Sequence, residues 1–270
     1  MSALDTRLPT AYRKPLRRCY RQIVGEGRFK LFELRHRQSD LLVGVDIGSW
    51  RPELPFLLAS RLAATRTALE GYLARHPAFA VSLSALPDDP DAPSVAVAML
   101  HASTSASVGP MAAVAGAVAD ELIAVMVGPM GCQEAFIENG GDCSLVVRSP
   151  LTVAIVGTSD AFSGRVGIRL PAGTWGVATS AGRLGPSLSL GRADACTAVA
   201  RTAALADAWA TALGNRIGGP LDIERALVAV DAPRGPLAVF ACSGDRAGFR
   251  GCLDLVPIEI GREAFHECRP

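Results

Sequence analysis

The chain lacks an uninterrupted apolar run long enough to cross a membrane. Its longest apolar stretch, 111–127, is broken by Gly116, Asp120 and Glu121, whereas a spanning helix needs about 20 consecutive apolar residues. The first residues contain arginines with no apolar segment behind them, which does not match a secretion signal. These absences predict a cytoplasmic protein with no membrane partner.

An excess of charge of either sign is also missing. With 27 basic and 26 acidic residues, the net charge is +1, which predicts no general attraction to nucleic acid. The basic residues nevertheless crowd the first forty positions, as Arg7, Arg13, Lys14, Arg17, Arg18, Arg21, Arg28, Lys30, Arg35 and Arg37. We expect residues 1–27 to form an irregular basic arm, which is either simply solvated or turned toward a phosphate or partner.

Cysteine pairs typical of zinc sites are absent. The seven cysteines include no CxxC pair, and the four histidines are dispersed, so no local segment supports a zinc site. An odd number of cysteines without a secretion signal predicts reduced thiols, mostly buried as small apolar side chains. Cys143 follows a glycine turn and could be reactive, but we expect a buried structural thiol there too.

The length of 270 residues fits one large domain or two small ones with a sizeable core. Residues 29–34 and 41–46 are typical of two strands in a hairpin. A helix is expected from Pro52 to about Arg75, ending before Pro77 because proline disfavours helical geometry in the residue before it.

The next segments predict a short strand over 94–100 and a second helix over 110–127. Small residues lie on nearly every side of this helix, so it should approach its neighbours closely. The same feature would suit the interface of a homodimer. A third helix is expected over 197–216, closed by Gly218 and Gly219, with a short helix at 223–230.

Further strands are expected at 136–137, 143–147, 151–156, 167–170, 175–179, 237–242 and 253–260. Strands and helices mix without regular alternation, so the sequence predicts an α+β fold with antiparallel sheets and packed helices. We expect a single domain over residues 28–270.

One candidate site is the turn Asn139–Gly140–Gly141–Asp142 between two apolar strands. Adjacent glycines permit positive φ and leave N–H groups free to face an anion. Asn139 and Asp142 add side-chain donors and acceptors beside them. The same four residues also suit a plain hairpin turn.

A second candidate site is the pair Asp207 and Thr211 in the third predicted helix. Residues four apart place both oxygens on one helix face, and a buried carboxylate there would need a partner. Mg²⁺ held by these oxygens and by substrate phosphate would satisfy it. The alternative is a solvated aspartate beside a threonine that bonds to its own helix backbone.

A third candidate is the turn at Thr179 and Ser180, together with the small-residue run 188–197. Small hydroxyl residues and glycines that lead into a helix N-terminus suit a phosphate group. A turn-rich linker is the alternative.

The order of these segments resembles the UPF0280 family, which is similar to the ApbE-like FAD:protein FMN transferases. The matching segments are 109–122 (GPMAAVAGAVADEL), 138–142 (ENGGD), 176–182 (GVATSAG), 191–200 (GRADACTAVA) and 206–215 (ADAWATALGN). The opening segments 39–46 and 74–86 resemble that family as well. The resemblance covers about residues 28–260 and implies an ApbE-like α+β fold with a cleft between the glycine turn and the third helix.

The resemblance also implies roles for individual residues. Asp207 and Thr211 match positions that help hold Mg²⁺. The turn residues Asn139, Gly140, Gly141 and Asp142 match residues that line a flavin-nucleotide cleft. Thr179 and Ser180 match a turn beside the pyrophosphate. Gly116 and Asp120 match a helix that closes the site. In the family reaction, the cation neutralises the pyrophosphate of FAD while a protein hydroxyl attacks and AMP leaves.

The chain also departs from the transferase pattern. Ala115 stands where the transferases have a lysine, residues 184–187 replace their histidine-bearing segment, and no histidine occurs from 102 to 265. Catalytic residues therefore remain unassigned. The sequence leaves open a metal-assisted protein of cofactor metabolism that binds FAD, FMN or another nucleotide, a non-catalytic ligand-binding or scaffold protein, and a protein of a pterin-dependent one-carbon pathway.

Overall fold

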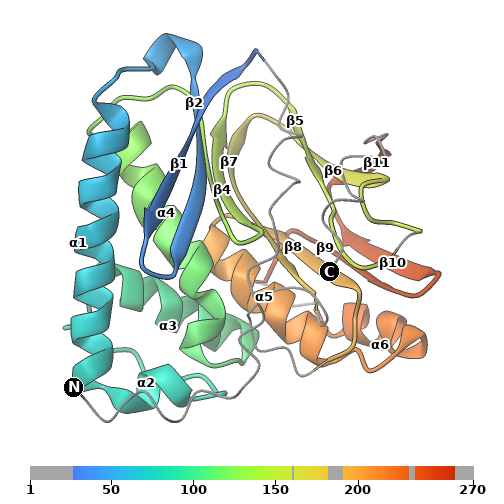
Figure 1. The fold of residues 1–270 in the computed structure, drawn as a ribbon. Coiled ribbons are helices and arrows are strands. Elements are labelled where there is room, and N and C mark those ends of the chain that lie inside the picture. Colours follow the sequence, from blue (N-terminus) through green and yellow to red (C-terminus); the bar gives the residue numbers. More distant parts are fainter. Residues whose placement is uncertain (1–26, 160, 182–190, 231–234, 259–270) are drawn as a thin grey trace.

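A computed structural model describes residues 27–159, 161–181, 191–230 and 235–258. Almost all of the predicted basic arm, 1–27, lies outside these residues. The described chain forms a large antiparallel sheet with helices on one face and a small sheet on the other (Figure 1). This arrangement confirms the predicted α+β class.

The large sheet has eight strands, all paired antiparallel. In spatial order they are β1 (Phe29–His36), β2 (Ser39–Asp46), β3 (Ala135–Asn139), β4 (Asp142–Val147), β7 (Gly173–Ser180), β8 (Ala195–Ala200), β9 (Ala238–Ser243) and β10 (Arg246–Gly251). The small sheet consists of β5 (Leu151–Ala154), β6 (Val166–Leu170) and β11 (Asp254–Pro257), with β6 in the middle.

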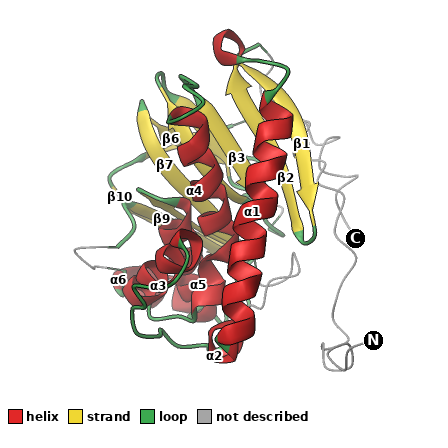
Figure 2. Ribbon diagram, turned by 90° about the vertical axis from the view of Figure 1, so that its left-hand side faces the viewer, coloured by secondary structure: helices red, strands yellow, loops and turns green. Residues whose placement is uncertain are grey.

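Helices cover one face of the large sheet, as Figure 2 shows from the helical side. They are α1 (Leu54–Arg75), α2 (Pro77–Val81), α3 (Ser94–Ala106), α4 (Val114–Val127), α5 (Ala203–Asn215) and α6 (Ile223–Val228), with 3-10 turns η2 (Ile47–Ser49), η3 (Pro110–Ala113) and η4 (Pro220–Asp222). α1 begins at Leu54, two residues after the predicted start at Pro52, and ends at Arg75 as predicted, with His76 as its C-terminal cap.

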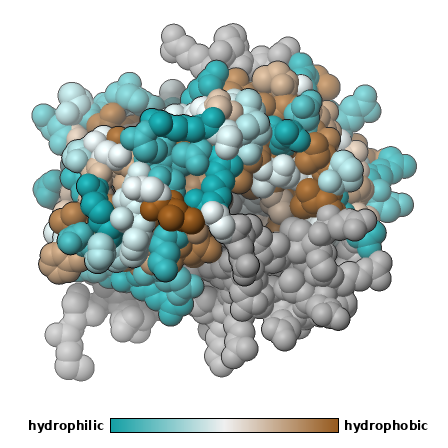
Figure 3. All heavy atoms as spheres, turned by 90° about the horizontal axis from the view of Figure 1, so that it is seen from above, coloured by the Kyte–Doolittle hydropathy of each residue, from teal (hydrophilic) through white to brown (hydrophobic). Residues whose placement is uncertain are grey.

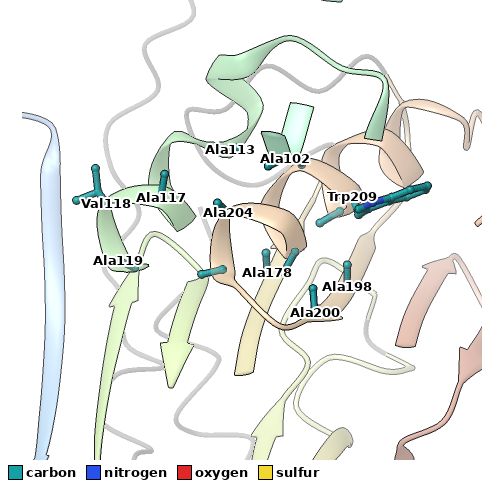
Figure 4. Close-up of a cluster of buried hydrophobic side chains, with 14 of the residues drawn as sticks. Ala102, Ala113, Ala117, Val118, Ala119, Ala178, Ala198, Ala200, Ala204 and Trp209 are labelled. Carbon is teal, nitrogen blue, oxygen red and sulfur yellow. The ribbon is translucent and has the colours of Figure 1, made fainter. Parts of the chain in front are cut away.

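Alternation along the central strands divides the core into two parts. On β7 and β8, Val177 and Val199 face the small sheet, while Ala178, Ala198 and Ala200 face the helices. Figure 4 shows these alanines beneath α5, where their small side chains leave room for the helix. The core under α5 is therefore thin, and this helix lies close to the sheet.

The predicted strand at 94–100 is wrong, because these residues form the first half of α3. The helix packs against α5 and η3 and buries Val95, Met99 and Leu100 along one side. Its valines suggest a strand when read alone, but packing of one helical face overrides such propensity.

The predicted start of the third helix is also wrong. Residues 195–200 form β8, between β7 and β9, and α5 starts only at Ala203. All six residues of β8 are buried. A strand buried on both faces shows no polar alternation, so its sequence cannot be told from a buried helix by periodicity.

The predicted small-residue helix is confirmed as η3 followed by α4. Pro110–Val127 is the segment of the described chain that is long and apolar enough to span a membrane, but 50% of it is buried inside the fold. Within α4 only Ala124 is exposed, because the helix packs against α3, α5, β3 and β4. α4 thus offers little surface to a second chain, and the homodimer stays a prediction.

Three of the described cysteines, Cys132, Cys196 and Cys242, are buried and free. Burial raises the pKa of the Cys242 thiol to about 12, and it also raises the pKa of Cys196. Cys143 is half-buried and Cys252 is exposed. Three of the five described cysteines are thus buried, as predicted, and the reduced state of the thiols stays a prediction.

Candidate functional site

The candidate site is built around the crossing of α4 and α5. A Cβ on Gly116 of α4 would lie 2.2 Å from the carbonyl oxygen of Ala203, a distance that no real side chain tolerates. The glycine therefore lets the two backbones touch at the first turn of each helix. This close approach places Asp207, one turn further along α5, beside the start of α4.

Asp207 caps the N-terminus of α4. Its Oδ2 accepts a hydrogen bond from the N–H of Gly116 at 3.1 Å. Burial raises the pKa of Asp207 to about 7; the nearby charge of Asp120 also raises it, and the N–H groups of Gly116 and Ala115 oppose the shift. The predicted need of this carboxylate for a partner is met in part by the positive end of α4.

Asp120, on α4, in turn caps the N-terminus of α5. Its Oδ1 accepts from the N–H of Ala203 and its Oδ2 from the N–H of Ala204, both at 2.9 Å. The hydroxyl of Ser144 on β4 donates to Oδ1 at 2.7 Å. Burial raises the pKa of Asp120, although these three donors favour its charged form.

The glycine turn forms the hairpin that joins β3 to β4. Gly140 and Gly141 have φ of 73° and 107°, and Asn139 pairs with Asp142 across the turn. The N–H of Gly141 donates to Oε1 of Glu138 at 2.7 Å. In this arrangement a protein carboxylate, rather than a bound anion, accepts from the turn.

Asn139 connects the hairpin to the helix crossing. Its Nδ2 donates to the carbonyl oxygen of Ala115 at 3.0 Å, next to the Gly116 N–H that Asp207 accepts. The hairpin also adjoins β7, since a Cβ on Gly141 would lie 3.8 Å from the carbonyl oxygen of Thr179. The glycine turn is thus linked, through Ala115 and Gly116 of α4, to Asp207 of α5.

Thr179 and Ser180 lie at the end of β7. The hydroxyl oxygen of Thr179 is 2.9 Å from that of Thr197 on β8. Ser180 faces the last turn of α5, where a Cβ on Gly214 would lie 3.4 Å from its hydroxyl oxygen. Thr211 is half-buried one turn before Gly214 and shares the face of Asp207.

The predicted phosphate approach along 188–197 is corrected in part by this geometry. Its described end, 191–197, leads into β8 rather than into a helix, and 188–190 lie outside the described residues. Three N–H groups in the first turn of α5 are already bonded, two to Asp120 and that of Leu205 to the Thr202 hydroxyl at 3.3 Å. Protein oxygens therefore occupy the place that a phosphate would take.

Sequence reasoning included Glu138 in the matching segment 138–142 without assigning it a role, and it missed Ser144. Glu138 precedes the turn and is buried, with 6% of its surface exposed, and Ser144 is buried on β4. The only available signal was a polar residue within an apolar strand, which does not identify the partner.

Two surface depressions of the described chain lie elsewhere. One of about 390 Å³ is lined by Asp46, Ser49, Arg51 and Gln133, among others, and one of about 170 Å³ by residues near Arg169. Neither is lined by the glycine hairpin or by α5. The cleft predicted between these two elements therefore stays a prediction.

The Asp207 carboxylate and the Thr211 hydroxyl are oxygen groups of the kind that a hard divalent cation prefers. Mg²⁺ prefers oxygen ligands and commonly keeps one or two carboxylates, with water and substrate phosphate completing its shell. A carboxylate can accept about four hydrogen bonds or equivalent contacts, so the bond from the Gly116 N–H does not use all the acceptor positions of Asp207. Burial is the main cause of its raised pKa, and a cation nearby would favour the charged carboxylate.

Comparison with known proteins supports the resemblance seen in the sequence. A family model described as "AbpE bacteria" matches residues 21–234. A UPF0280 protein of Methanosphaerula palustris is 44% identical over 162 residues, 58% of this chain and 66% of that protein. A UPF0280 protein of Methanococcus maripaludis is 33% identical over 218 residues, 78% of this chain and 86% of that protein.

Among solved structures, the fold is similar to the apo form of the flavinyl transferase ApbE from Pseudomonas stutzeri. The TM-score is 0.54 at 16% identity, covering 90% of this chain and 98% of that one, a likeness that concerns the fold. Together with the sequence matches, it shows that the chain belongs to the UPF0280 family and has an ApbE-like fold.

Proposed function

We propose that this protein binds a flavin- or nucleotide-type ligand with the help of Mg²⁺ and serves cofactor metabolism, with FMN transfer from FAD as the reaction class. The observation that supports this most strongly is the convergence of four separate segments. The first turn of α4, the β3–β4 hairpin, the end of β7 and the buried side of α5 are linked by the contacts of Asn139, Gly141, Ser180 and Asp207.

In this proposal, Asp207 and Thr211 supply the protein ligands of the cation. When bound, Mg²⁺ would neutralise the pyrophosphate oxygens of the ligand. The N–H of Gly116 fixes one oxygen of Asp207, which aims the carboxylate before a ligand arrives. A metal-binding side chain that is already oriented loses less conformational entropy when the cation binds.

The other predicted residues surround this centre. Asn139, Gly140, Gly141 and Asp142 would line the ligand from the hairpin. Thr179 and Ser180 would approach its phosphate groups from β7, with hydroxyls that both donate and accept. Gly116 would close the site from α4, and Asp120 would stand behind it.

A second candidate function is ligand binding without catalysis, with a nucleotide or a pterin as the ligand. The specific observation in its favour is the loss of transferase groups. Ala115 replaces a lysine, and no histidine occurs from 102 to 265. The Glu138 carboxylate also occupies the N–H of Gly141, and this negative charge would disfavour a phosphate at that point.

Calorimetric titration tests the proposed ligand class. We expect FAD, FMN, ATP or a reduced pterin to bind more tightly with Mg²⁺ than without it, and Asp207→Asn to remove this Mg²⁺ dependence. Asp254→Asn, the same substitution at an exposed position on β11, is the matched control and should bind like wild type. Failure of all four ligands to bind would contradict the proposal.

Release of AMP separates the two functions. Transfer breaks the bond between the FMN phosphorus and the AMP oxygen and forms a new bond to an acceptor hydroxyl, so AMP must appear in equal amount to transferred FMN. We expect AMP to form from FAD with Mg²⁺ and a hydroxyl acceptor. Tight FAD binding without AMP release would favour the non-catalytic function.

A further inference from the structure

Asp120 and Asp207 belong to a closed ring of contacts between α4 and α5. Asp207 accepts from Gly116 at the start of α4, and Asp120 lies one turn after Gly116. Asp120 accepts from Ala203 at the start of α5, and Asp207 lies one turn after Ala203. Each helix thus contributes one carboxylate to the N-terminus of the other.

We propose that Asp120 is a positioning residue for Asp207, and that the two helices hold each other in register through this reciprocal capping. The inference rests on the proposed role of Asp207 as a cation ligand. It assigns Asp120 a place behind the site rather than in contact with the ligand, because three protein donors already surround its carboxylate.

The geometry explains why one carboxylate acts through the other. The hydrogen bonds of Asp120 fix Ala203 and Ala204, and helix geometry then sets where Asp207 lies one turn later. Gly116 is required in the same place, since any Cβ there would strike Ala203. A shift of the first turn of α5 would therefore move the Asp207 oxygens away from both Gly116 and a cation.

Two alternatives to positioning predict different outcomes. If Asp120 were only a local cap of α5, its loss would affect Ala203 and Ala204 and leave Gly116 unchanged. If it acted only through its charge, a displaced carboxylate at position 120 would serve as well. The variants Asp120→Asn and Asp120→Glu therefore separate the three roles.

Amide hydrogen exchange measured by NMR tests the ring itself. We expect Asp120→Asn to speed exchange about tenfold at Ala203 and Ala204, because loss of a cap changes local opening equilibria by about this factor. Exchange should speed up equally at Gly116, although the side chain of residue 120 makes no hydrogen bond to Gly116. Amides of β2 report global unfolding and should speed up less. Unchanged exchange at Gly116 would overturn the ring.

The matched control is Glu121→Gln, which removes the neighbouring charge of α4, paired with Arg61; Glu121 makes none of the hydrogen bonds of the ring. It should leave the exchange of Gly116 within about twofold of wild type. If Asp120→Asn does not fold, Asp207→Asn tests the ring from the other side. It should speed exchange at Ala203 and Ala204, and unchanged exchange there would overturn the proposal.

Binding of Mn²⁺, followed by its paramagnetic resonance, tests the positioning role. We expect both Asp120→Asn and Asp120→Glu to weaken Mn²⁺ binding about tenfold, a loss of the size of one misplaced ligand contact, while Glu121→Gln binds as wild type does. Wild-type affinity in Asp120→Glu would overturn positioning in favour of charge alone. If wild type does not bind Mn²⁺, the cation role in the proposed function is contradicted. The hydrogen-exchange experiment would still show whether the reciprocal capping of α4 and α5 exists.

Discussion

At the scale of single residues, Asp207 shows two opposing influences on one carboxyl group. Burial and the charge of Asp120 favour its protonated form, while the N–H groups of Gly116 and Ala115 favour the carboxylate. The balance raises its pKa to about 7, so the folded protein holds this proton more tightly than the unfolded chain does. Stability from this proton is therefore fully present below pH 3.8 and is lost as the pH rises through about 7.

Asp207→Asn should remove this pH dependence, because asparagine stays neutral at every pH. We expect the free energy of unfolding of the variant, relative to wild type, to increase between about pH 4 and pH 8. Denaturant titrations at a series of pH values measure it. Parallel pH profiles for the two proteins would contradict the raised pKa.

Gly116 is a second residue whose effect follows from one distance. Gly116→Ala should destabilise the protein by about 1–3 kcal/mol, because the new methyl group must push α5 away from α4. Gly71→Ala, one turn before the end of α1, is the control, since the nearest neighbour of the new Cβ would be the end of Arg75 at 3.6 Å. The control should stabilise by up to about 1 kcal/mol through helix propensity alone. Equal effects of the two substitutions would rule out a contact at Gly116.

At the scale of elements, the β3–β4 hairpin illustrates how a turn is held from two sides. Gly140 and Gly141 supply the positive φ angles that a two-residue hairpin requires. Asn139 and Glu138 then tie the turn to α4 and to its own backbone. These hydrogen bonds restrain the turn from both sides.

Gly141→Ala tests the strain that this turn demands. Its φ of 107° lies outside the region open to L-residues, and space for the methyl group is ample, so backbone strain alone should cost about 1–3 kcal/mol. Gly131→Ala, at φ of 66° with open space around it, should cost only about 1–2 kcal/mol. Thermal denaturation of both variants gives the comparison, and a larger loss at Gly131 would contradict it.

At the scale of the whole molecule, the residues of the proposed site come from the helical layer and from the large sheet beneath it. The helical layer rests on a sheet face of alanines, and the small sheet covers the other face (Figures 1 and 4). On the face that Figure 3 displays, apolar side chains occur in small groups among polar ones. A ligand that contacts the hairpin, β7 and α5 together would stabilise the packing of the helical layer on the sheet.

Ligand binding should therefore raise the melting temperature. At a free concentration about 100 times its Kd, one ligand adds about 2.7 kcal/mol, which for a chain of this size corresponds to a rise of about 5–10 °C. We expect this rise with FAD and Mg²⁺ together, larger at pH 8 than at pH 6 because protonated Asp207 cannot hold the cation. The same rise in Asp207→Asn would contradict the assigned metal ligand.

The amino-acid sequence alone predicts the α+β class, the β1–β2 hairpin, α1 and its proline-marked end, and the glycine turn. It also places Asp207 and Thr211 on one face of a helix. All of these depend on contacts between residues close in the chain, where periodicity, turn chemistry and proline act directly. The family resemblance could be read from motifs for the same reason.

Tertiary structure alone decides the rest. Residues 195–200 become a strand because β7 and β9 enclose them, and 94–100 become a helix because α5 and η3 bury one side. Asp120 meets Ala203 across 83 residues, and Asp207 meets Gly116 across 91. No local pattern encodes such partners, since they arise only when two helices cross at a glycine and each N-terminus meets the carboxylate of the other.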